Sequence, residues 1–372
     1  MIIGVPKEIH RQENRVGLSP FAVSQLTGEG HTVYVENGAG EAAHFTDRDY
    51  EEQGAQIVYG PEEAYQRADL VCRVSRPSTE ELDLLKPGEV IVAFQHLAVI
   101  PRENMDRFME LGITLIGYEV ITDETGDFPV LNPFSEMAGQ MAIPLATHYL
   151  QTTKGGRGIL IGNVPGVPPA TVLIIGAGTV GFAAARSALG DGAHVLVVDD
   201  DMSQLRNLSR ELIGRPHTAF ATRERLSRYS EIADVVVGAV LVPGERSPSL
   251  ITEDMVKKMK QGSVIIDVAI DQGGCVETSR PTTLDRPTFL QHGVVHYCVP
   301  NMTANVPRTA SRVLTNAALP YVKALAGQGL TGALKADPAL AGGVYLYEGK
   351  MVHPGLGEHF GIESIPLEDL LR

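Results

Sequence analysis

The sequence has few cysteines and no long apolar run, and each absence excludes a class of protein. Its 372 residues include three cysteines, Cys72, Cys275 and Cys298. They are odd in number and far apart, and no CxxC or Cys/His metal spacing accompanies them, so we expect reduced thiols and no metal site. No apolar stretch approaches the length of a membrane span. The first residues lack the basic region and apolar run of a secretion signal. We therefore expect a cytoplasmic protein.

Positive charge is also scarce. Lysine and arginine number 31 against 45 aspartates and glutamates, which gives a net charge of −14. Nucleic acid is an unsuitable partner, because binding its phosphates needs a basic face. An anionic substrate would be repelled at long range, so any carboxylate that it carries needs a local cation. The apolar content of 44% is typical of a globular protein, and the length favours two domains.

The most informative segment is VLIIGAGTVGFAAARSALGDGAHVLVVDDD, residues 172–201. It has the pattern of a strand, a glycine turn, a helix, a second strand and an acid. Gly176, Gly178 and Gly181 follow the first strand in GxGxxG spacing, and Thr179 and Val180 open the helix. Such a turn brings backbone N–H groups and the positive end of a helix dipole to a pyrophosphate. The segment therefore predicts a dinucleotide site rather than a purely structural glycine turn.

The acid that ends the second strand selects the cofactor. Asp199 lies eighteen residues after Gly181, where its carboxylate can accept hydrogen bonds from ribose hydroxyls. A 2′-phosphate at this position would meet Asp199, with Asp200 and Asp201 close by, and no arginine follows until Arg206. This arrangement favours NAD over NADP.

Strand and helix patterns alternate over the first 120 residues and again from the fingerprint to about residue 303. Alternation of this kind predicts an α/β fold with mostly parallel sheets. We expect two Rossmann-like domains, with a dinucleotide domain at 129–305 inserted into a substrate domain made of 1–128 and 306–372. Helix patterns are expected at 135–150, with Ser135 as the N-cap, and at 312–325. Two crossings between the domains would form a hinge and a cleft suited to substrate.

Four polar residues outside the fingerprint could carry chemistry, and each also has an ordinary structural explanation. His96 follows a predicted buried strand and could transfer a proton, or could simply be hydrogen-bonded at a strand end. Arg15 could hold a carboxylate with two parallel hydrogen bonds, or could be a solvated surface residue. Asp271 could face the nicotinamide or cap a turn. Ser135 could contact a cofactor phosphate or act only as a cap.

Several longer motifs together resemble the alanine dehydrogenase family, which is related to the NAD-binding subunit of proton-pumping transhydrogenase. The resemblance runs nearly end to end. The segments that carry it are GVPKEI, ENRVGLSP, HLA at 96–98, GGRGILIGNVPGV at 155–167, GAGTVG, GAVLVPG at 238–244, VIIDVAIDQGGCVET at 264–278, and HY–VPNM with VPRT around 300–309.

The resemblance implies an enzyme that interconverts an amino acid with a 2-oxo acid and ammonia by means of NAD. It also implies a homo-oligomer, commonly a hexamer. By the same resemblance, Arg15 holds the substrate carboxylate, His96 is the acid–base residue and Asp271 is the essential aspartate. The implied cofactor contacts are Ser135, Gly176, Gly178, Thr179, Val180, Gly181, Asp199, Val240, Leu241, Ile270 and Asn301.

One departure from the family pattern falls in the substrate half. The family has K-V-K-E-P at the end of its third substrate-domain strand, and its second lysine grips the substrate. Here the stretch is Arg73-Val74-Ser75-Arg76-Pro77, so Ser75 stands where the lysine should be. Serine supplies neither the charge nor the reach. Arg76 should point to the opposite face of the strand, and would need a local bulge to substitute.

Three hypotheses remain open on the sequence. The first is an NAD-dependent dehydrogenase that deaminates an alanine-like or related L-amino acid and also runs in reverse. The second is an opine-type enzyme that reduces the imine of a 2-oxo acid and a larger amine, for which Ser75 and Gln95 would suit a bulkier substrate. The third is a catalytically silent NAD-binding protein, against which the retention of Arg15, His96 and Asp271 argues.

Overall fold

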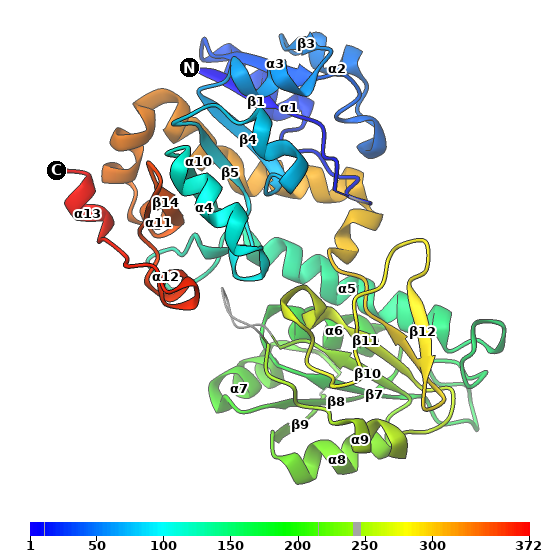
Figure 1. Cartoon of the computed structure of the whole chain (residues 1–372). Coiled ribbons are helices and arrows are strands. Elements are labelled where there is room, and N and C mark those ends of the chain that lie inside the picture. The colour runs from blue at the N-terminus through cyan, green and yellow to red at the C-terminus, as the bar shows by residue number, and fades with distance from the viewer. Residues whose placement is uncertain (11, 215, 241–246) are drawn as a thin grey trace. The chain divides into compact units, whose positions relative to one another are not determined.

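The structure is a computed structural model that describes residues 1–10, 12–214, 216–240 and 247–372. The chain forms two compact units. The first unit combines Met1–Pro133 with Ala304–Arg372, and the second is the continuous stretch Phe134–Thr303. Each unit contains its own sheet (Figure 1). A search of the described residues for a helix of membrane-spanning length and hydropathy finds none.

The sheet of the first unit has eight strands, in the order β15-β14-β6-β5-β4-β1-β2-β3. The strands from β6 to β3 are parallel, whereas β14 and β15 pair in antiparallel fashion at one edge. Their bounds are β1 Ile2–Val5, β2 Thr32–Glu36, β3 Gln56–Val58, β4 Leu70–Ser75, β5 Val90–Phe94, β6 Thr114–Gly117, β14 Val344–Tyr347 and β15 Lys350–Met351.

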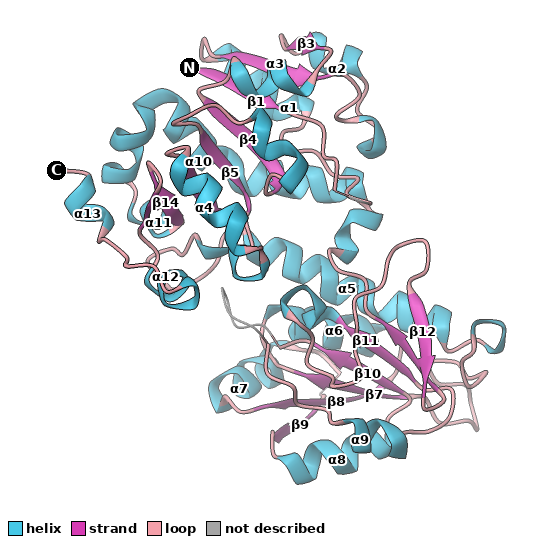
Figure 2. Cartoon of the chain, viewed as in Figure 1, coloured by secondary structure: helices cyan, strands magenta, loops and turns pink. Residues whose placement is uncertain are grey.

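Helices cover this sheet (Figure 2). They are α1 Pro20–Gly28, α2 Asp47–Glu51, α3 Pro61–Gln66, α4 Arg102–Glu110, α10 Pro307–Ala336, α11 Pro338–Gly342, α12 Pro354–Phe360 and α13 Leu367–Leu370, with short 3₁₀ turns after several strands. Ser19 is the N-cap residue of α1, and Pro20 lies in its first turn. Helix α10 packs on α1 and β4. The C-terminal stretch 304–372 therefore completes the unit that residues 1–133 begin.

The second unit has a seven-stranded sheet in the order β12-β13-β11-β10-β7-β8-β9, in which only β12 is antiparallel. Its strands are β7 Thr171–Ile175, β8 His194–Asp199, β9 His217–Phe220, β10 Val235–Gly238, β11 Val264–Asp267, β12 Thr288–Gln291 and β13 Val294–Tyr297. Its helices are α5 Leu131–Tyr149, α6 Thr179–Gly190, α7 Met202–Glu211, α8 Arg223–Ile232 and α9 Glu253–Lys258.

The apolar run at 172–175 is explained by burial on both faces of this sheet. Val172 and Ile174 pack with residues of α5, α6 and α7, whereas Leu173 and Ile175 pack with residues of α8 and α9. Alternate residues of a strand point to opposite faces, so a strand covered on both sides must be apolar throughout.

Two helix boundaries differ from the sequence prediction. Helix α5 begins at Leu131, so Ser135 lies inside its first turns and is not the N-cap. Pro133 is compatible with these early positions, because the first N–H groups of a helix need no partner within it. Helix α10 runs from Pro307 to Ala336, with a kink at Gly329, and is longer than the predicted 312–325.

The two sheets share one connection pattern. In both units the chain starts a central strand, builds two strands outward on one side, and then crosses to build the other side. The crossing falls between β1 and β4 in the first unit and between β7 and β10 in the second. In open parallel sheets, ligands bind beyond the carboxyl ends of the strands at such switch points. Each unit therefore offers one favoured place for a ligand.

Candidate functional site

The glycine turn lies at the switch point of the second unit, between β7 and α6. Gly176 has φ +105°, and a Cβ atom there would lie 2.4 Å from the carbonyl oxygen of Ala239. A Cβ atom on Gly181 would lie 1.9 Å from the carbonyl oxygen of Gly176, whereas one on Gly178 would meet nothing within 4 Å. Two glycines are therefore required by packing, and Gly178 leaves open space beside the helix start. Thr179 and Val180 form the first turn of α6.

Asp199 ends β8 and is tied to this turn. Its Oδ2 accepts the backbone N–H of Ala177 at 2.6 Å, and its Oδ1 accepts that of Asp201 at 2.7 Å. The carboxylate is half-buried, and each oxygen keeps a further lone pair for a hydroxyl donor. Asp201 in turn caps α7 through the N–H of Ser203. The open space at Gly178, the start of α6 and the acid at the end of β8 fit the phosphates and the ribose of a dinucleotide.

The other predicted cofactor residues of this unit lie in helix α5 and in the segments that follow β10 and β11. Ser135 is buried in α5. One turn further along, a Cβ atom on Gly139 would lie 2.3 Å from the carbonyl oxygen of Val180, so α5 packs closely on the start of α6. Val240 follows β10, and Ile270 is buried in the 3₁₀ turn Val268–Gln272. Leu241 lies outside the described residues.

Asp271 and Asn301 are thirty residues apart and are brought into contact. The Oδ1 atom of Asp271 accepts the backbone N–H of Asn301 at 2.7 Å. Asn301 has φ +51°, in the left-handed region. The aspartate therefore fixes a strained loop beyond β13, and both side chains are exposed.

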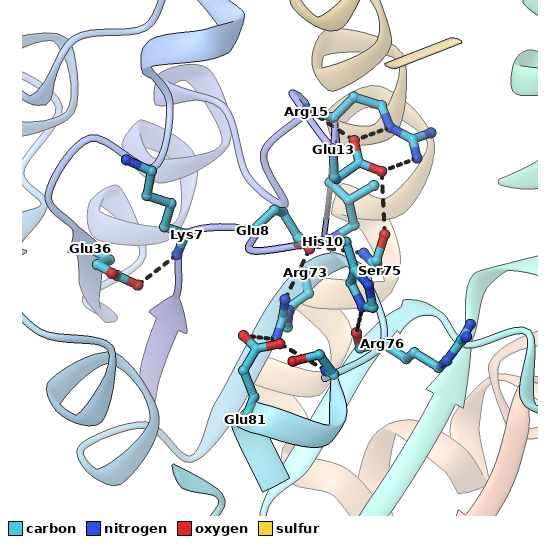
Figure 3. Close-up of polar contacts among 12 residues, drawn as sticks. Lys7, Glu8, His10, Glu13, Arg15, Glu36, Arg73, Ser75, Arg76 and Glu81 are labelled. Atoms are coloured by element: carbon cyan, nitrogen blue, oxygen red, sulfur yellow. Dashed lines mark hydrogen bonds and ion pairs between the residues drawn. The ribbon is translucent and has the colours of Figure 1, made fainter. Parts of the chain in front are cut away.

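In the first unit, Arg15 is buried against a carboxylate that the sequence analysis overlooked. Its Nε and Nη2 atoms donate to Glu13 at 2.7 and 2.5 Å, and the two side chains are 4% and 3% exposed. Ser75, at the end of β4, donates its hydroxyl to the same carboxylate at 3.3 Å (Figure 3). Burial alone would raise the pKa of Glu13, but the charge and hydrogen bonds of Arg15 outweigh it and lower that pKa.

A second buried cation, Arg73, lies on β4 two residues before Ser75. Arg73 is fully buried and donates to Glu8 at 3.0 Å and to Glu81 at 2.6 Å. Burial raises the pKa of Glu8 despite the neighbouring charge of Arg73. Glu8 also accepts the backbone N–H of Val74 at 2.7 Å. This network fixes the loop after β1 on the end of β4.

His96 stands just beyond β5 in a strained conformation. Its φ of 42° and ψ of 49° are left-handed, which is uncommon for a residue with a side chain. Its N–H donates to Glu119 Oε1 at 2.7 Å, and its ring stacks on Phe94 with centroids 6.0 Å apart. Glu119, in the 3₁₀ turn Tyr118–Val120 that follows β6, also accepts the N–H of Gln95 and the hydroxyl of Tyr345. This buried carboxylate was likewise missed by the sequence analysis.

The structure therefore groups the predicted residues within each unit. In the first unit, Arg15 and His96 lie in the loops that follow β1 and β5, and Ser75 ends β4. The second unit carries the glycine turn, Asp199, Asp271 and Asn301. Within the described residues, no group of three or more His, Cys, Asp or Glu side chains is placed to hold a metal ion. Glu119 directly follows an apolar strand pattern, and this position could have drawn attention to it, whereas Glu13 lies eight residues beyond β1 and has no such signal.

Comparison with known families gives matches over nearly the whole chain. The profile described as "Alanine dehydrogenase/PNT, N-terminal domain" matches residues 4–138, and "Alanine dehydrogenase/PNT, C-terminal domain" matches residues 142–354. The chain is 44% identical over 372 residues to an alanine dehydrogenase of Halomonas elongata, with 100% of both chains covered. It is 43% identical over 362 residues to one of Mycobacterium tuberculosis, with 97% of both covered.

Solved structures give the same result. An L-alanine dehydrogenase matches with a TM-score of 0.91 and 43% identity, covering 97% of this chain and 99% of its own. A transhydrogenase from Sinorhizobium meliloti matches with a TM-score of 0.80 at 24% identity, covering 95% of this chain and all of its own, and so shares the fold.

Proposed function

This chain belongs to the alanine dehydrogenase/PNT family, and on that premise we propose that it is an NAD-dependent amino-acid dehydrogenase. It converts an L-amino acid, alanine or a related one, to a 2-oxo acid and ammonia, and it also runs the reverse reductive amination. The observation that carries the proposal is the identity of 43–44% to alanine dehydrogenases along the whole chain. The site geometry of both units supports it.

NAD is the cofactor, and the second unit holds it. The open space beside Gly178 at the start of α6 would hold the pyrophosphate, next to Thr179 and Val180. The carboxylate of Asp199 would accept hydrogen bonds from the ribose hydroxyls, and its negative charge would repel a 2′-phosphate. The remaining cofactor contacts would come from Ser135, Val240, Ile270 and Asn301. Leu241, which lies outside the described residues, is included on the family resemblance alone. Bound NAD supplies the two-electron oxidation by accepting hydride from the substrate Cα.

The side chains of the first unit bind the substrate carboxylate and transfer a proton. His96 accepts a proton from the reacting nitrogen or oxygen and returns it in the reverse direction. Arg15 orients the substrate carboxylate, and its geometry is fixed by the two bonds to Glu13. Ser75 lies beside the same Glu13 carboxylate, to which it donates its hydroxyl. Asp271 orders the loop of Asn301 at the nicotinamide end.

A steady-state assay tests this function. Purified protein is mixed with NAD and a panel of L-amino acids, and with NADH, ammonium and a panel of 2-oxo acids, while absorbance of the reduced cofactor is followed. We expect turnover with alanine or a close relative, and loss of it in His96→Ala. No turnover in either direction with any member of the panel would refute the proposal.

A second candidate is favoured by Ser75. Its hydroxyl donates to Glu13, so this position brings no cation to the site and leaves room for a bulkier amine. An opine-type imine reductase would use such room. Replacing ammonium by ornithine in the reductive assay separates the two, because only the second candidate would turn over faster with the larger amine.

Two further features are part of the proposal. The protein forms a homo-oligomer, a hexamer by family resemblance, and it works in the cytoplasm. Light scattering coupled to size-exclusion chromatography measures the oligomer, and a monomer at micromolar concentration would contradict it.

A further inference from the structure

The buried charges at the carboxyl end of β4 do not balance. Arg15 pairs with Glu13, and Arg73 lies between Glu8 and Glu81. Each of these side chains is at most 4% exposed. In the part of the chain that the structure describes, the two groups thus hold three carboxylates and two arginines. When all five are ionised, one negative charge remains uncompensated in a place that water scarcely reaches, where charge interactions are strong.

The two groups are connected through Ser75, the last residue of β4. Its N–H lies 3.4 Å from Glu8 Oε1, and its hydroxyl donates to Glu13 at 3.3 Å. Burial and, to a lesser extent, the negative charge of Glu13 raise the pKa of Glu8, although Arg73 opposes them. The carboxylates on the two sides of Ser75 therefore influence each other, and the excess negative charge is concentrated beside this residue.

Binding of a substrate carboxylate enlarges the imbalance. On the proposed function, Arg15 holds that carboxylate, and its single positive charge is then shared between the substrate and Glu13. A carboxylate that leaves water is costly unless a cation compensates it. The imidazole of His96 does not provide this charge, because it must be neutral to accept the proton. A second cation beside Glu13 would stabilise the complex.

The neighbouring cations of this unit do not fill that role. Figure 3 shows Arg76 and Lys7 directed away from Glu13. Arg76 donates to the backbone carbonyl of Gln95, and Lys7 lies beside Glu36, which accepts its backbone N–H at 2.8 Å. Among the described residues, Glu13 has an ion pair with Arg15 alone. The missing cation can therefore come with the substrate.

The hydroxyl of Ser75 offers such a cation a place. Its bond to Glu13, at 3.3 Å, is long, because O–H···O bonds are usually about 2.8 Å, so it is easily exchanged. A hydroxyl accepts as well as donates, and an ammonium has three protons to give. One proton could go to Glu13 and another to Ser75. The neighbouring strands β4 and β1 flank the switch point of this sheet, where a doubly wound sheet binds its ligand.

We propose that the substrate site binds amino acids whose side chain ends in an ammonium group, through Glu13 and Ser75, in preference to uncharged amino acids of the same length. Arg15 keeps the α-carboxylate. This inference rests on the proposed function, because it names a substrate class for that same site and reaction. The hydride still leaves Cα for NAD, water adds to the resulting imine, and the 2-oxo acid and ammonia are released. The side-chain ammonium is unchanged by the reaction.

The test uses pairs of amino acids that match in size and differ in charge. L-Ornithine is paired with L-norleucine, and L-diaminobutyrate with L-norvaline. Oxidation of each is followed with NAD and without any added 2-oxo acid, so an opine-type reaction lacks its second substrate. We expect kcat/KM of the charged member to exceed that of its partner about ten- to a hundredfold in at least one pair. An apolar pocket would give the opposite order, because it would desolvate the ammonium without a partner.

Substitutions of Ser75 locate the effect. Ser75→Lys places a fixed ammonium beside Glu13, so the ratio should fall to about one or below while alanine is still oxidised. Ser75→Ala removes the accepting hydroxyl but keeps Glu13, so the ratio should fall only about threefold. Ser209→Lys is the matched control, since it adds the same charge at an exposed position of α7 in the other unit. It should leave the ratio at the value of the unmodified enzyme.

Calorimetric titration of ornithine and norleucine into the enzyme with NAD measures the same preference without turnover. If neither charged nor uncharged amino acids are oxidised, the proposed function fails, and the ratio of the two Kd values still decides the inference. Ratios within about twofold of one for both pairs in the unmodified enzyme would overturn it, as would no detectable binding of ornithine. A preference that Ser75→Lys leaves unchanged would also overturn it, because the ammonium would then bind elsewhere.

Discussion

The carboxylate of Glu119 accepts the backbone N–H of His96 at 2.7 Å and, through its other oxygen, that of Gln95 at 3.1 Å. One buried side chain in the 3₁₀ turn after β6 thus fixes two successive residues beyond β5. The left-handed conformation of His96 costs about 1–2 kcal/mol, and these bonds stabilise it. Glu119 is a positioning residue for the imidazole.

Replacement of Glu119 tests this role. Glu119→Gln leaves one oxygen acceptor and turns an NH₂ group toward a backbone donor, so we expect kcat to fall about tenfold or more, with NADH affinity unchanged. The pH profile of kcat should also shift, because the imidazole loses its fixed orientation. Tyr345→Phe is the control, since it removes only the third bond to Glu119. Equal kcat and an unchanged pH profile in Glu119→Gln would contradict the role.

The glycine turn offers a pair of substitutions with opposite expected effects. Gly178→Ala meets open space, so stability should change by less than about 0.5 kcal/mol while the Kd for NADH rises about tenfold or more. Gly181→Ala places a methyl group 1.9 Å from a carbonyl oxygen and should destabilise the protein by about 2–4 kcal/mol.

Denaturant unfolding followed by circular dichroism, together with NADH titration, measures both quantities. Gly190→Ala, at the far end of α6 with nothing within 4 Å, is the control. Unimpaired NADH binding by Gly178→Ala would remove the argument for phosphate contact at that residue.

Asp199 should set the preference for NAD. Asp199→Asn keeps an oxygen that can accept the N–H of Ala177 but removes the negative charge. We expect the ratio of kcat/KM for NAD over NADP to fall about ten- to a hundredfold, mainly because NADP is no longer repelled. Asp200→Asn is a suitable control, because the neighbouring acid ends no strand. An unchanged ratio would show that the selectivity lies elsewhere.

Glu89 makes stability depend on pH. It is fully buried before β5, and neither carboxylate oxygen has a hydrogen-bond partner within the described residues. Burial raises the pKa of Glu89 from its ordinary 4.5 to about 8, against the opposing charge of Lys86. The folded state therefore holds a proton that the unfolded state releases. Its contribution is complete below pH 4.5 and is lost as the pH rises through about 8.

Glu89→Gln mimics the protonated form at every pH. The free energy of unfolding of the unmodified protein should therefore fall relative to that of Glu89→Gln by roughly 2–4 kcal/mol between pH 5 and pH 9. Circular dichroism is the suitable probe, since the chain has no tryptophan. Glu124→Gln, at an exposed site, should show no such divergence. Parallel curves for the unmodified protein and Glu89→Gln would contradict the prediction.

Local pattern was enough to predict the α/β class, the glycine turn and the acid that ends β8. Each of these depends on residues close together in the sequence, such as Gly176, Gly181 and Asp199. The start of α5 was predicted wrongly, because Ser135 has the chemistry of a cap while Pro133 is equally at home in a first turn.

The partners of the candidate site residues could not be predicted, because the fold selects them. Glu13 bonds Arg15 only two residues away, yet nothing in the sequence marks this pair as buried. Glu119 reaches His96 across 23 residues through adjacent parallel strands. The direction of Arg76 depends on the pairing register of β4 and β5, which two short apolar strands do not specify on their own.

The loop that carries Arg15 is anchored by side chains of helix α10, which the ribosome translates late. The N–H of Val16 donates to Ser311 Oγ at 3.0 Å, and that of Ser19 donates to Thr315 Oγ1 at 3.1 Å, both on α10. During translation, the continuous stretch 134–303 can therefore fold before the residues of α10 that hold the N-terminal loop have been synthesised. The guanidinium near the N-terminus reaches its final position only after translation has passed residue 315.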